Sequence, residues 1–204
     1  ASDTDVELMK LYIGIYLGTS STKLLLMDET GTILNTAARE YPLEFPAPGW
    51  SQQAPEDWRK AVMEGIPELL QGFDGADVAG IGCGGQMHGL VMLDENNEVL
   101  RPSIIWCDQR TAEECTEIEA AVGGRERLIE ITANPALTGF TASKIRWVQK
   151  HEPEIYQQCA HILLAKDYIR FLLTGAYATE VSDASGMQLL DIEKRQWSLE
   201  LCDI

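Results

Sequence analysis

The stretch LYIGIYLGTSSTK, residues 11–23, decides how the chain begins to fold. Its apolar residues alternate, so that Ile13, Ile15 and Leu17 lie on one face of an extended segment and Tyr16 lies on the other. Residues 18–22 then combine one glycine with four hydroxyl side chains, which favours a turn before the apolar pattern resumes. The stretch therefore predicts a β-hairpin.

A third strand and a helix are expected after this hairpin. A turn at residues 28–31 leads into a strand over residues 32–40, which completes an antiparallel meander. Apolar side chains then recur at three- and four-residue steps over residues 55–70, where Pro55 suits a first helical position. We expect a helix there that Pro67 kinks or shortens, because proline removes a hydrogen-bond donor.

The next segment carries strands around a glycine-rich corner. The pattern predicts a buried strand over residues 78–83, a tight connection over residues 84–89 and another strand over residues 90–93. A turn at Asn96 and Asn97 is expected to end the last of these strands.

Helical spacing dominates the rest of the chain. We expect helices near residues 110–121, 125–131, 141–151, 153–159 and 166–173, with Gly175 as a C-cap of the last one. Residues 197–204 resemble the first turns of another helix, which suggests that the natural protein continues or that a partner covers this end. Strands followed by helices indicate an α/β architecture, with a mixed sheet that opens with an antiparallel meander and is covered by helices.

Charge and composition exclude several classes of function. The 204 residues include 32 acidic and 16 basic side chains, and the formal net charge of −16 repels phosphate backbones and anionic lipids. We therefore expect no nucleic-acid partner and no membrane partner. With 45% apolar residues, the chain is long enough to form one large domain or two small ones.

Cysteine spacing and the first residues bear on the cellular compartment. No C-x-x-C pair occurs, so reduced thiols and no zinc site are expected for Cys83, Cys107, Cys115, Cys159 and Cys202. Residues 1–10 are polar and acidic, and we expect a disordered leader rather than a signal peptide. No later run reaches membrane-spanning length. These features favour a cytoplasmic location.

The bend of the first hairpin carries groups that can bind phosphate. Gly18 lets an anion approach the main chain, the hydroxyl groups of Thr19 and Ser20 donate hydrogen bonds, and Lys23 adds a positive charge. Taken alone, an ordinary hairpin turn is the favoured interpretation, because short motifs give many false matches.

Several motifs in order make the sequence resemble the FGGY family of sugar kinases, which have the fold of the actin, hexokinase and ribonuclease H superfamily. The resemblance covers residues 11–204. Besides the hairpin, it rests on GWSQQ at 49–53, PEDW at 55–58, GQMHG at 85–89, RPSIIWCDQR at 101–110, GFTASKIRWV at 139–148, LAKDY at 164–168 and SDASG at 182–186.

The resemblance implies a sugar-binding site. The sequence QMHG at residues 86–89 is similar to that of the xylulokinase branch, in which the Met-His pair contacts an open-chain ketose, so Gln86, Met87 and His88 are the expected sugar ligands. A lone histidine would more simply be a structural residue. The resemblance also places three residues that follow an apolar strand along the same cleft, namely Trp106, Asp108 and Arg110.

Two further motifs have a structural interpretation. Lys144 and Trp147 share one helical stretch, and we expect Trp147 to pack against the core and Lys144 to be solvated. Asp183 and Ser185 are either site residues or turn formers.

Tyr16 departs from the pattern of the family. The resemblance implies an aspartate in the first strand, within Gly-x-Asp-x-Gly-Thr, whose carboxylate helps to hold the magnesium of MgATP. This chain has Tyr16 there. A phenol is neutral near pH 7 and is a poor ligand for magnesium, so positioning of the metal nucleotide should suffer. We expect no metal site within this chain.

The resemblance also implies parts that follow Ile204. The general base and the adenine-binding domain of the family lie beyond it, so the complete enzyme would use Mg²⁺ and ATP, whereas this chain should bind neither tightly and be inactive alone. The expected partners are a ketopentose substrate, the C-terminal kinase domain and a second copy of the chain in a homodimer.

Three functional hypotheses remain open. The leading one is the N-terminal, sugar-binding half of an ATP-dependent xylulokinase, which converts D-xylulose and ATP into xylulose 5-phosphate and ADP. The second, supported by Tyr16, is a noncatalytic sugar-binding or regulatory homologue. The third is another FGGY kinase that acts on ribulose, fuculose, gluconate or glycerol.

Overall fold

The structure, a computed structural model, describes residues 9–204, so most of the expected leader lies outside the described residues. The chain forms two compact units, each built from two segments. The first unit contains the residues up to Tyr41 together with Glu56–Gly85, and the second contains Pro42–Pro55 together with Gln86–Ile204. Each unit has its own elements and its own buried side chains.

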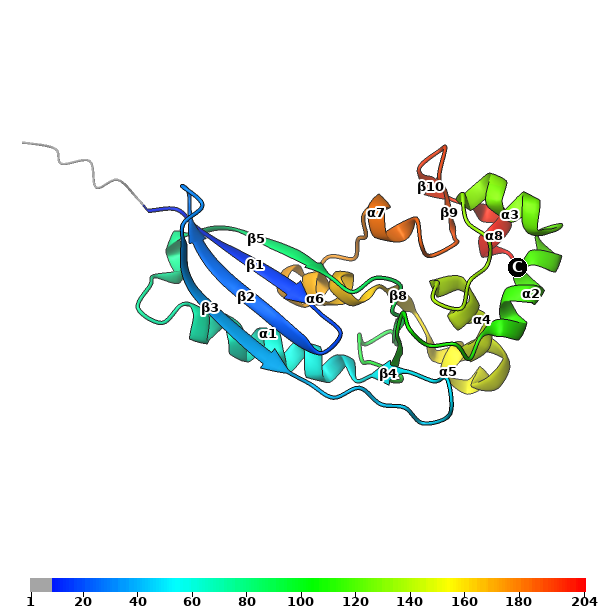
Figure 1. Cartoon of the computed structure of the whole chain (residues 1–204), viewed down its shortest axis with the longest axis horizontal. Helices are drawn as coiled ribbons and strands as arrows, with labels where there is room; N and C mark the ends of the chain where they lie inside the picture. Colours follow the sequence, from blue (N-terminus) through cyan, green and yellow to red (C-terminus); the bar gives the residue numbers. More distant parts are fainter. Residues whose placement is uncertain (1–8) are drawn as a thin grey trace, which may run out of the picture. The chain divides into compact units, whose positions relative to one another are not determined.

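The first unit is built on a four-stranded sheet. Strands β1 (Leu11–Leu17), β2 (Ser21–Asp28) and β3 (Ile33–Glu40) form the predicted antiparallel meander. After the short 3₁₀ helix η1 (Gly75–Asp77), strand β5 (Val78–Gly85) pairs in parallel with β1, which gives the order β3-β2-β1-β5 (Figure 1).

Helix α1 (Pro55–Leu69) packs on one face of this sheet. The side chain of Leu24 on β2 lies so close to Gly65 that a Cβ there would be 2.7 Å from its Cδ1 atom. Asn35 on β3 donates a hydrogen bond of 3.0 Å to the carbonyl oxygen of Leu69. The helix passes through Pro67 to Leu69, and Leu70 N still donates to the carbonyl oxygen of Ile66 at 3.1 Å, so Pro67 does not shorten it appreciably.

The prediction of a buried strand over residues 78–83 is wrong. None of the residues of β5 is buried, and Ile81 is 45% exposed. Within the described residues β5 is an edge strand, hydrogen bonded to β1 alone, and its four glycines supply no side chains to bury. The strand also runs on to Gly85, so the tight connection begins later than predicted.

The second unit contains three short two-stranded pairings. They are β4 (Gln52–Gln53) with β7 (Ser103–Ile104), β6 (Val91–Leu93) with β8 (His161–Leu163), and β9 (Leu190–Asp191) with β10 (Gln196–Trp197). Of these strands the sequence predicts β6 and the apolar strand before Trp106, which is β7, whereas the remaining pairings of two or three residues leave no measurable alternation.

The predicted helices of this unit are confirmed, most of them within two residues at each end. They are α2 (Ala112–Ala121), α3 (Arg125–Thr132), α4 (Thr141–His151), α5 (Pro153–Gln158) and α6 (Ala165–Thr174), followed by the shorter α7 (Val181–Ala184) and α8 (Leu199–Cys202). Gly175 ends α6 with a φ of 71°, the left-handed conformation expected of a glycine C-cap.

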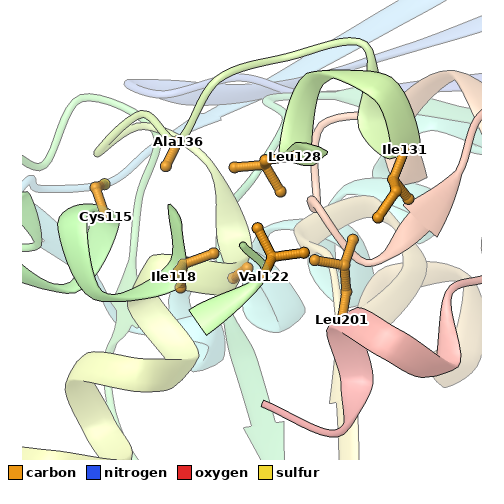
Figure 2. Close-up of a cluster of buried hydrophobic side chains, with 8 residues drawn as sticks. Cys115, Ile118, Val122, Leu128, Ile131, Ala136 and Leu201 are labelled. Carbon is orange, nitrogen blue, oxygen red and sulfur yellow. The ribbon is translucent and has the colours of Figure 1, made fainter. Parts of the chain in front are cut away.

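Buried apolar clusters hold the helices of the second unit together. The largest of these joins α2, α3, α4 and α8 (Figure 2) and consists of Cys115, Ile118, Val122, Leu128, Ile131, Ala136, Ala142 and Leu201. A second cluster, which contains Trp147, joins α4 to the segment around β6 and β7, so Trp147 packs as expected. All five cysteines are free thiols. Among the described residues, no helix has the length and apolar character needed to span a membrane.

Candidate functional site

The corner that follows β5 gives His88 an unusual backbone conformation. Its φ is 70°, a left-handed value that costs a non-glycine residue about 1–2 kcal/mol. The His88 carbonyl oxygen accepts hydrogen bonds from Thr141 Oγ1, at 3.1 Å, and from Lys144 Nζ, at 3.4 Å. Both donors belong to the first turn of α4, so this helix holds the corner in place.

The imidazole of His88 is enclosed by two other segments of the second unit. Its ring packs edge-on against Phe140, with 4.9 Å between the ring centroids. On another side it lies against Gly186, where a Cβ atom would be 2.2 Å from His88 Cε1 and 2.5 Å from Nδ1. Nδ1 is fully buried and has no hydrogen-bond partner. Burial lowers the pKa of His88 to about 4, with a further contribution from the positive charge of Lys144.

The expectation that Lys144 is solvated is wrong, because its side chain is fully buried. Its ammonium group donates hydrogen bonds to the carbonyl oxygens of Gly139 and His88. Burial lowers the pKa of Lys144 to about 7, while the negative charge of Asp108 acts in the opposite direction. The buried amine thus links two loops of the second unit by hydrogen bonds.

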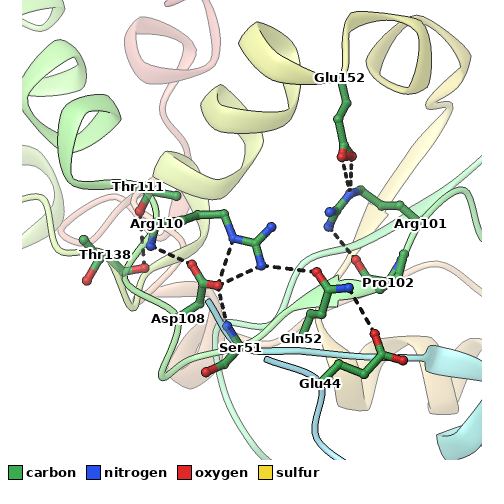
Figure 3. Close-up of polar contacts among 10 residues, drawn as sticks. All are labelled: Glu44, Ser51, Gln52, Arg101, Pro102, Asp108, Arg110, Thr111, Thr138 and Glu152. Carbon is green, nitrogen blue, oxygen red and sulfur yellow. Dashed lines mark hydrogen bonds and ion pairs between the residues drawn. The ribbon is translucent and has the colours of Figure 1, made fainter. Parts of the chain in front are cut away.

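Asp108 and Arg110 form a buried network (Figure 3). Asp108 is inaccessible to solvent and accepts hydrogen bonds from Ser51 N at 2.7 Å and from Arg110 Nε at 2.9 Å. Arg110, whose side chain is 1% exposed, places its guanidinium carbon 4.0 Å from the ring centroid of Trp50 and 4.9 Å from that of Trp147. These contacts fix the two side chains within the protein.

The other predicted sugar ligands differ in exposure. Met87 is 49% exposed and Trp106 is 47% exposed, whereas Gln86 is buried and donates a hydrogen bond of 3.0 Å to Gln53. The carbonyl oxygen of Trp106 is 2.9 Å from the position that a Cβ on Gly139 would occupy, so the Trp106 loop lies beside the loop that packs on His88.

The six predicted ligands therefore fall into two groups. Met87, His88 and Trp106 keep some accessible surface, whereas Gln86, Asp108 and Arg110 make hydrogen bonds inside the unit.

Asp183 and Ser185 have different roles. Asp183 is 1% exposed, and its Oδ2 atom lies 3.3 Å from Lys166 Nζ. Burial raises its pKa, while Lys166 and the main-chain amide of His88 act in the opposite direction. Ser185 donates a hydrogen bond of 2.7 Å to the carbonyl oxygen of Ser182, as a turn former would. Only Asp183 thus contributes to the surroundings of His88.

The first hairpin presents a second group of predicted site residues, in the first unit. The turn is tighter than predicted, because Gly18 N donates to Ser21 O at 2.9 Å and the strand resumes at Ser21. A Cβ on Gly18 would lie 2.7 Å from Ser21 O, so the turn itself requires glycine. Thr19 is partly buried and Ser20 is exposed.

Tyr16 and Lys23 face each other across this hairpin. They are directly paired between β1 and β2, and both are exposed. Together with residues from β3, α1 and β5 they line an open pocket of about 670 Å³ on the first unit.

Comparisons with known proteins agree on one family. The model described as "FGGY family of carbohydrate kinases, N-terminal domain" matches residues 11–204. The xylulose kinase of Lactococcus lactis is 48% identical over 198 residues, which are 96% of this chain and 39% of that protein. The chain belongs to the FGGY family of carbohydrate kinases.

Solved structures agree with this assignment. The xylulose kinase of Rhodospirillum rubrum matches with a TM-score of 0.89 and 30% identity, over 95% of this chain and 40% of that one. A gluconate kinase of Lactobacillus acidophilus matches with a TM-score of 0.88 and 30% identity, over 96% of this chain and 39% of that one. The predicted fold is therefore confirmed, and the chain spans about 40% of the length of these FGGY relatives.

FGGY kinases in general use ATP and a divalent metal, but the described residues do not fit a metal of their own. No group of three or more histidine, cysteine or acidic side chains in the described part of the chain could hold a metal ion. At position 16, where the resemblance implies a carboxylate, the chain carries a phenol that is 57% exposed. The bend of the hairpin offers a phosphate group Ser20 and Lys23, and none of residues 16–23 carries a carboxylate for magnesium.

Sequence patterns did not identify two residues that contact His88 and one that contacts Gln86. Phe140 and Gly186 occur within motifs 139–148 and 182–186, so their segments are recognisable but their contacts with the imidazole are not. Gln53 is the partner of Gln86 and occurs within motif 49–53. The order of the motifs was the available signal, since no local periodicity connects these positions.

Proposed function

We propose that the chain is the sugar-binding part of an ATP-dependent pentulose kinase, whose complete form phosphorylates D-xylulose to xylulose 5-phosphate. The observation that carries this proposal is the corner at Met87 and His88, where a packed imidazole follows an exposed Met87, with the loop of the exposed Trp106 beside the loop that contacts the ring. Further support comes from the 48% identity to a protein named xylulose kinase.

The proposed roles of the six predicted sugar ligands follow from how far each side chain is buried. His88 has one ring nitrogen, Nε2, left for a ligand, and it can hydrogen bond to an oxygen of an open-chain ketose. Met87 and Trp106 would cover the carbon chain of the sugar. Gln86, Asp108 and Arg110 would act through the loops they hold, because Gln86 Nε2, Asp108 Oδ2 and Arg110 Nε already have hydrogen-bond partners within the protein.

Phosphate contacts belong to the hairpin in this proposal. Ser20 and Lys23 would contact phosphate groups of ATP, while Gly18 and Thr19 shape the turn. ATP supplies the phosphoryl group in the complete enzyme, and the ligands for its magnesium and the general base would come from outside this chain.

Isothermal titration calorimetry tests the sugar assignment. The chain should bind D-xylulose weakly and in preference to ribulose, gluconate and glycerol, and His88→Ala should weaken this binding about tenfold or more, which is about 1.4 kcal/mol. His151→Ala is the matched control, because the side chain of His151 is exposed and lies at the last residue of α4, whereas the corner contacts the start of that helix.

Binding that His88→Ala leaves unchanged would remove the sugar contact from this proposal. A ranking that places gluconate or glycerol above D-xylulose would assign the chain to a different FGGY kinase.

A noncatalytic sugar-binding homologue is the second candidate function, and Tyr16 is the observation that favours it. Its test uses a polypeptide that joins this chain to the C-terminal kinase domain of the family. If Tyr16→Asp restores turnover in that protein, the regulatory function loses its main support; if both forms bind the ketose and neither turns over, it gains support.

A further inference from the structure

The imidazole of His88 occupies space that exists because residue 186 is glycine. The φ of Gly186 lies outside the left-handed region, so its backbone would accept an alanine. The obstacle is His88 itself, since a Cβ at position 186 would lie 2.2 Å from its Cε1 and 2.5 Å from its Nδ1. Such separations are far below van der Waals contact.

The main chain of His88 is held from a different direction. Lys144 Nζ and Thr141 Oγ1 both donate to its carbonyl oxygen, at 3.4 Å and 3.1 Å, and Lys144 also reaches the carbonyl oxygen of Gly139. These bonds stabilise the left-handed backbone conformation at His88 and bring Phe140 against the ring.

We propose that Gly186 and Lys144 are positioning residues, which fix the His88 imidazole with Nδ1 toward the protein interior and Nε2 toward the sugar. This inference rests on the proposed function and deepens it. Neither residue touches the sugar in this scheme, and each acts through the orientation of His88.

The surroundings of the ring also select its tautomer. Nδ1 is buried without a partner, and an orphaned buried N–H group is a rarer arrangement than an unsatisfied acceptor. The ring therefore carries its hydrogen on Nε2 and donates a hydrogen bond to a carbonyl or hydroxyl oxygen of the ketose. Two charged side chains lie near the corner. Lys144 opposes protonation of His88, and the pKa of Asp183 is itself raised by burial.

Nitrogen NMR of histidine-labelled chain tests the position of the ring without any ligand. The chain has three histidines, so His88→Gln assigns the signal. We expect His88 to remain neutral, with its hydrogen on Nε2, from pH 8 down to about pH 5. In Gly186→Ala the displaced ring should titrate near the ordinary value of about 6.5.

Sugar affinity supplies the second measurement. Gly186→Ala and Lys144→Met should each weaken D-xylulose binding about tenfold, whereas Gly75→Ala should leave the affinity and the His88 signal unchanged. Gly75 is a suitable control because the nearest atom to its added Cβ is Leu70 Cδ1, at 3.8 Å.

The outcomes separate the two proposals. If the NMR result is as expected but the wild type binds no ketose, the positioning of His88 stands and the proposed function fails. If D-xylulose binds and Gly186→Ala changes neither affinity nor titration, the positioning role is overturned. Should Gly186→Ala not fold, the wild-type spectrum still decides, because a His88 that titrates near 6.5 or is protonated on Nδ1 overturns the proposal.

Discussion

Lys144 carries an amine inside the protein, between the carbonyl oxygens of His88 and Gly139. Its pKa of about 7 results first from burial, and then from the opposing charges of Asp108, which raises it, and Arg110, which lowers it. The thiols of Cys107 and Cys115 also raise it. A group with these surroundings makes the stability of the folded chain depend on pH.

The sign of this dependence follows from proton binding. Between about pH 7 and the ordinary lysine value near 10.4, the unfolded chain holds a proton on Lys144 that the folded chain has released, so stability should rise with pH in this range. In urea denaturation from pH 7 to 10, the free energy of unfolding of the wild type should therefore rise relative to that of Lys144→Met, by up to about 1.4 kcal/mol per pH unit. Lys60→Met, which removes an exposed lysine, is the control. Parallel curves for wild type and Lys144→Met would contradict the burial of the amine.

At the level of elements, strand β5 differs most from its prediction. Its apolar sequence resembles a central strand, yet it lies at a sheet edge in the described residues and none of its residues is buried. Gly84 and Gly85 end the strand next to β1 in very different surroundings. An added Cβ on Gly85 would meet Leu17 O at 2.5 Å and Leu17 Cβ at 2.7 Å, whereas nothing lies within 4 Å of one on Gly84.

These neighbours give a matched pair of variants. Gly85→Ala should destabilise the chain by about 1–3 kcal/mol, because the clash is with backbone atoms of β1 that cannot rotate away. Gly84→Ala should change stability little. Chemical denaturation monitored by circular dichroism measures both, and equal effects of the two substitutions would show that the β1–β5 pairing at Leu17 and Gly85 is not as described.

At the level of the whole molecule, the chain covers about 40% of its relatives. Phosphoryl transfer depends on positioning and charge stabilisation from several groups around the phosphate, and the described residues lack a cluster that could hold the metal. Under the proposed function, ketose binding would belong to this chain and phosphoryl transfer would need the rest of the enzyme.

We predict that the 204-residue chain releases no ADP above background when it is supplied with D-xylulose, ATP and magnesium. A coupled assay measures this, with a full-length xylulose kinase such as that of Lactococcus lactis as the positive control. Turnover within the usual kinase range, about 1–100 per second, would contradict the prediction and place a complete catalytic set within these residues.

The sequence by itself determined the meander, the helix α1, most helices of the second unit and the family. These depend on patterns within a few residues, such as alternation over 11–17, helical spacing over 141–151 and glycine at position 175. The order of the motifs also predicts that the corner at His88 binds sugar, and this stays a prediction.

Only the tertiary structure decided which polar groups are buried and what surrounds His88. Lys144 was expected to be solvated, whereas packing places it inside the second unit, as it does Asp108 and the side chain of Arg110. The imidazole of His88 contacts Phe140 and Gly186, which lie tens of positions away in the sequence. Contacts of this kind are set by how helices and loops pack, so they leave no period in the sequence.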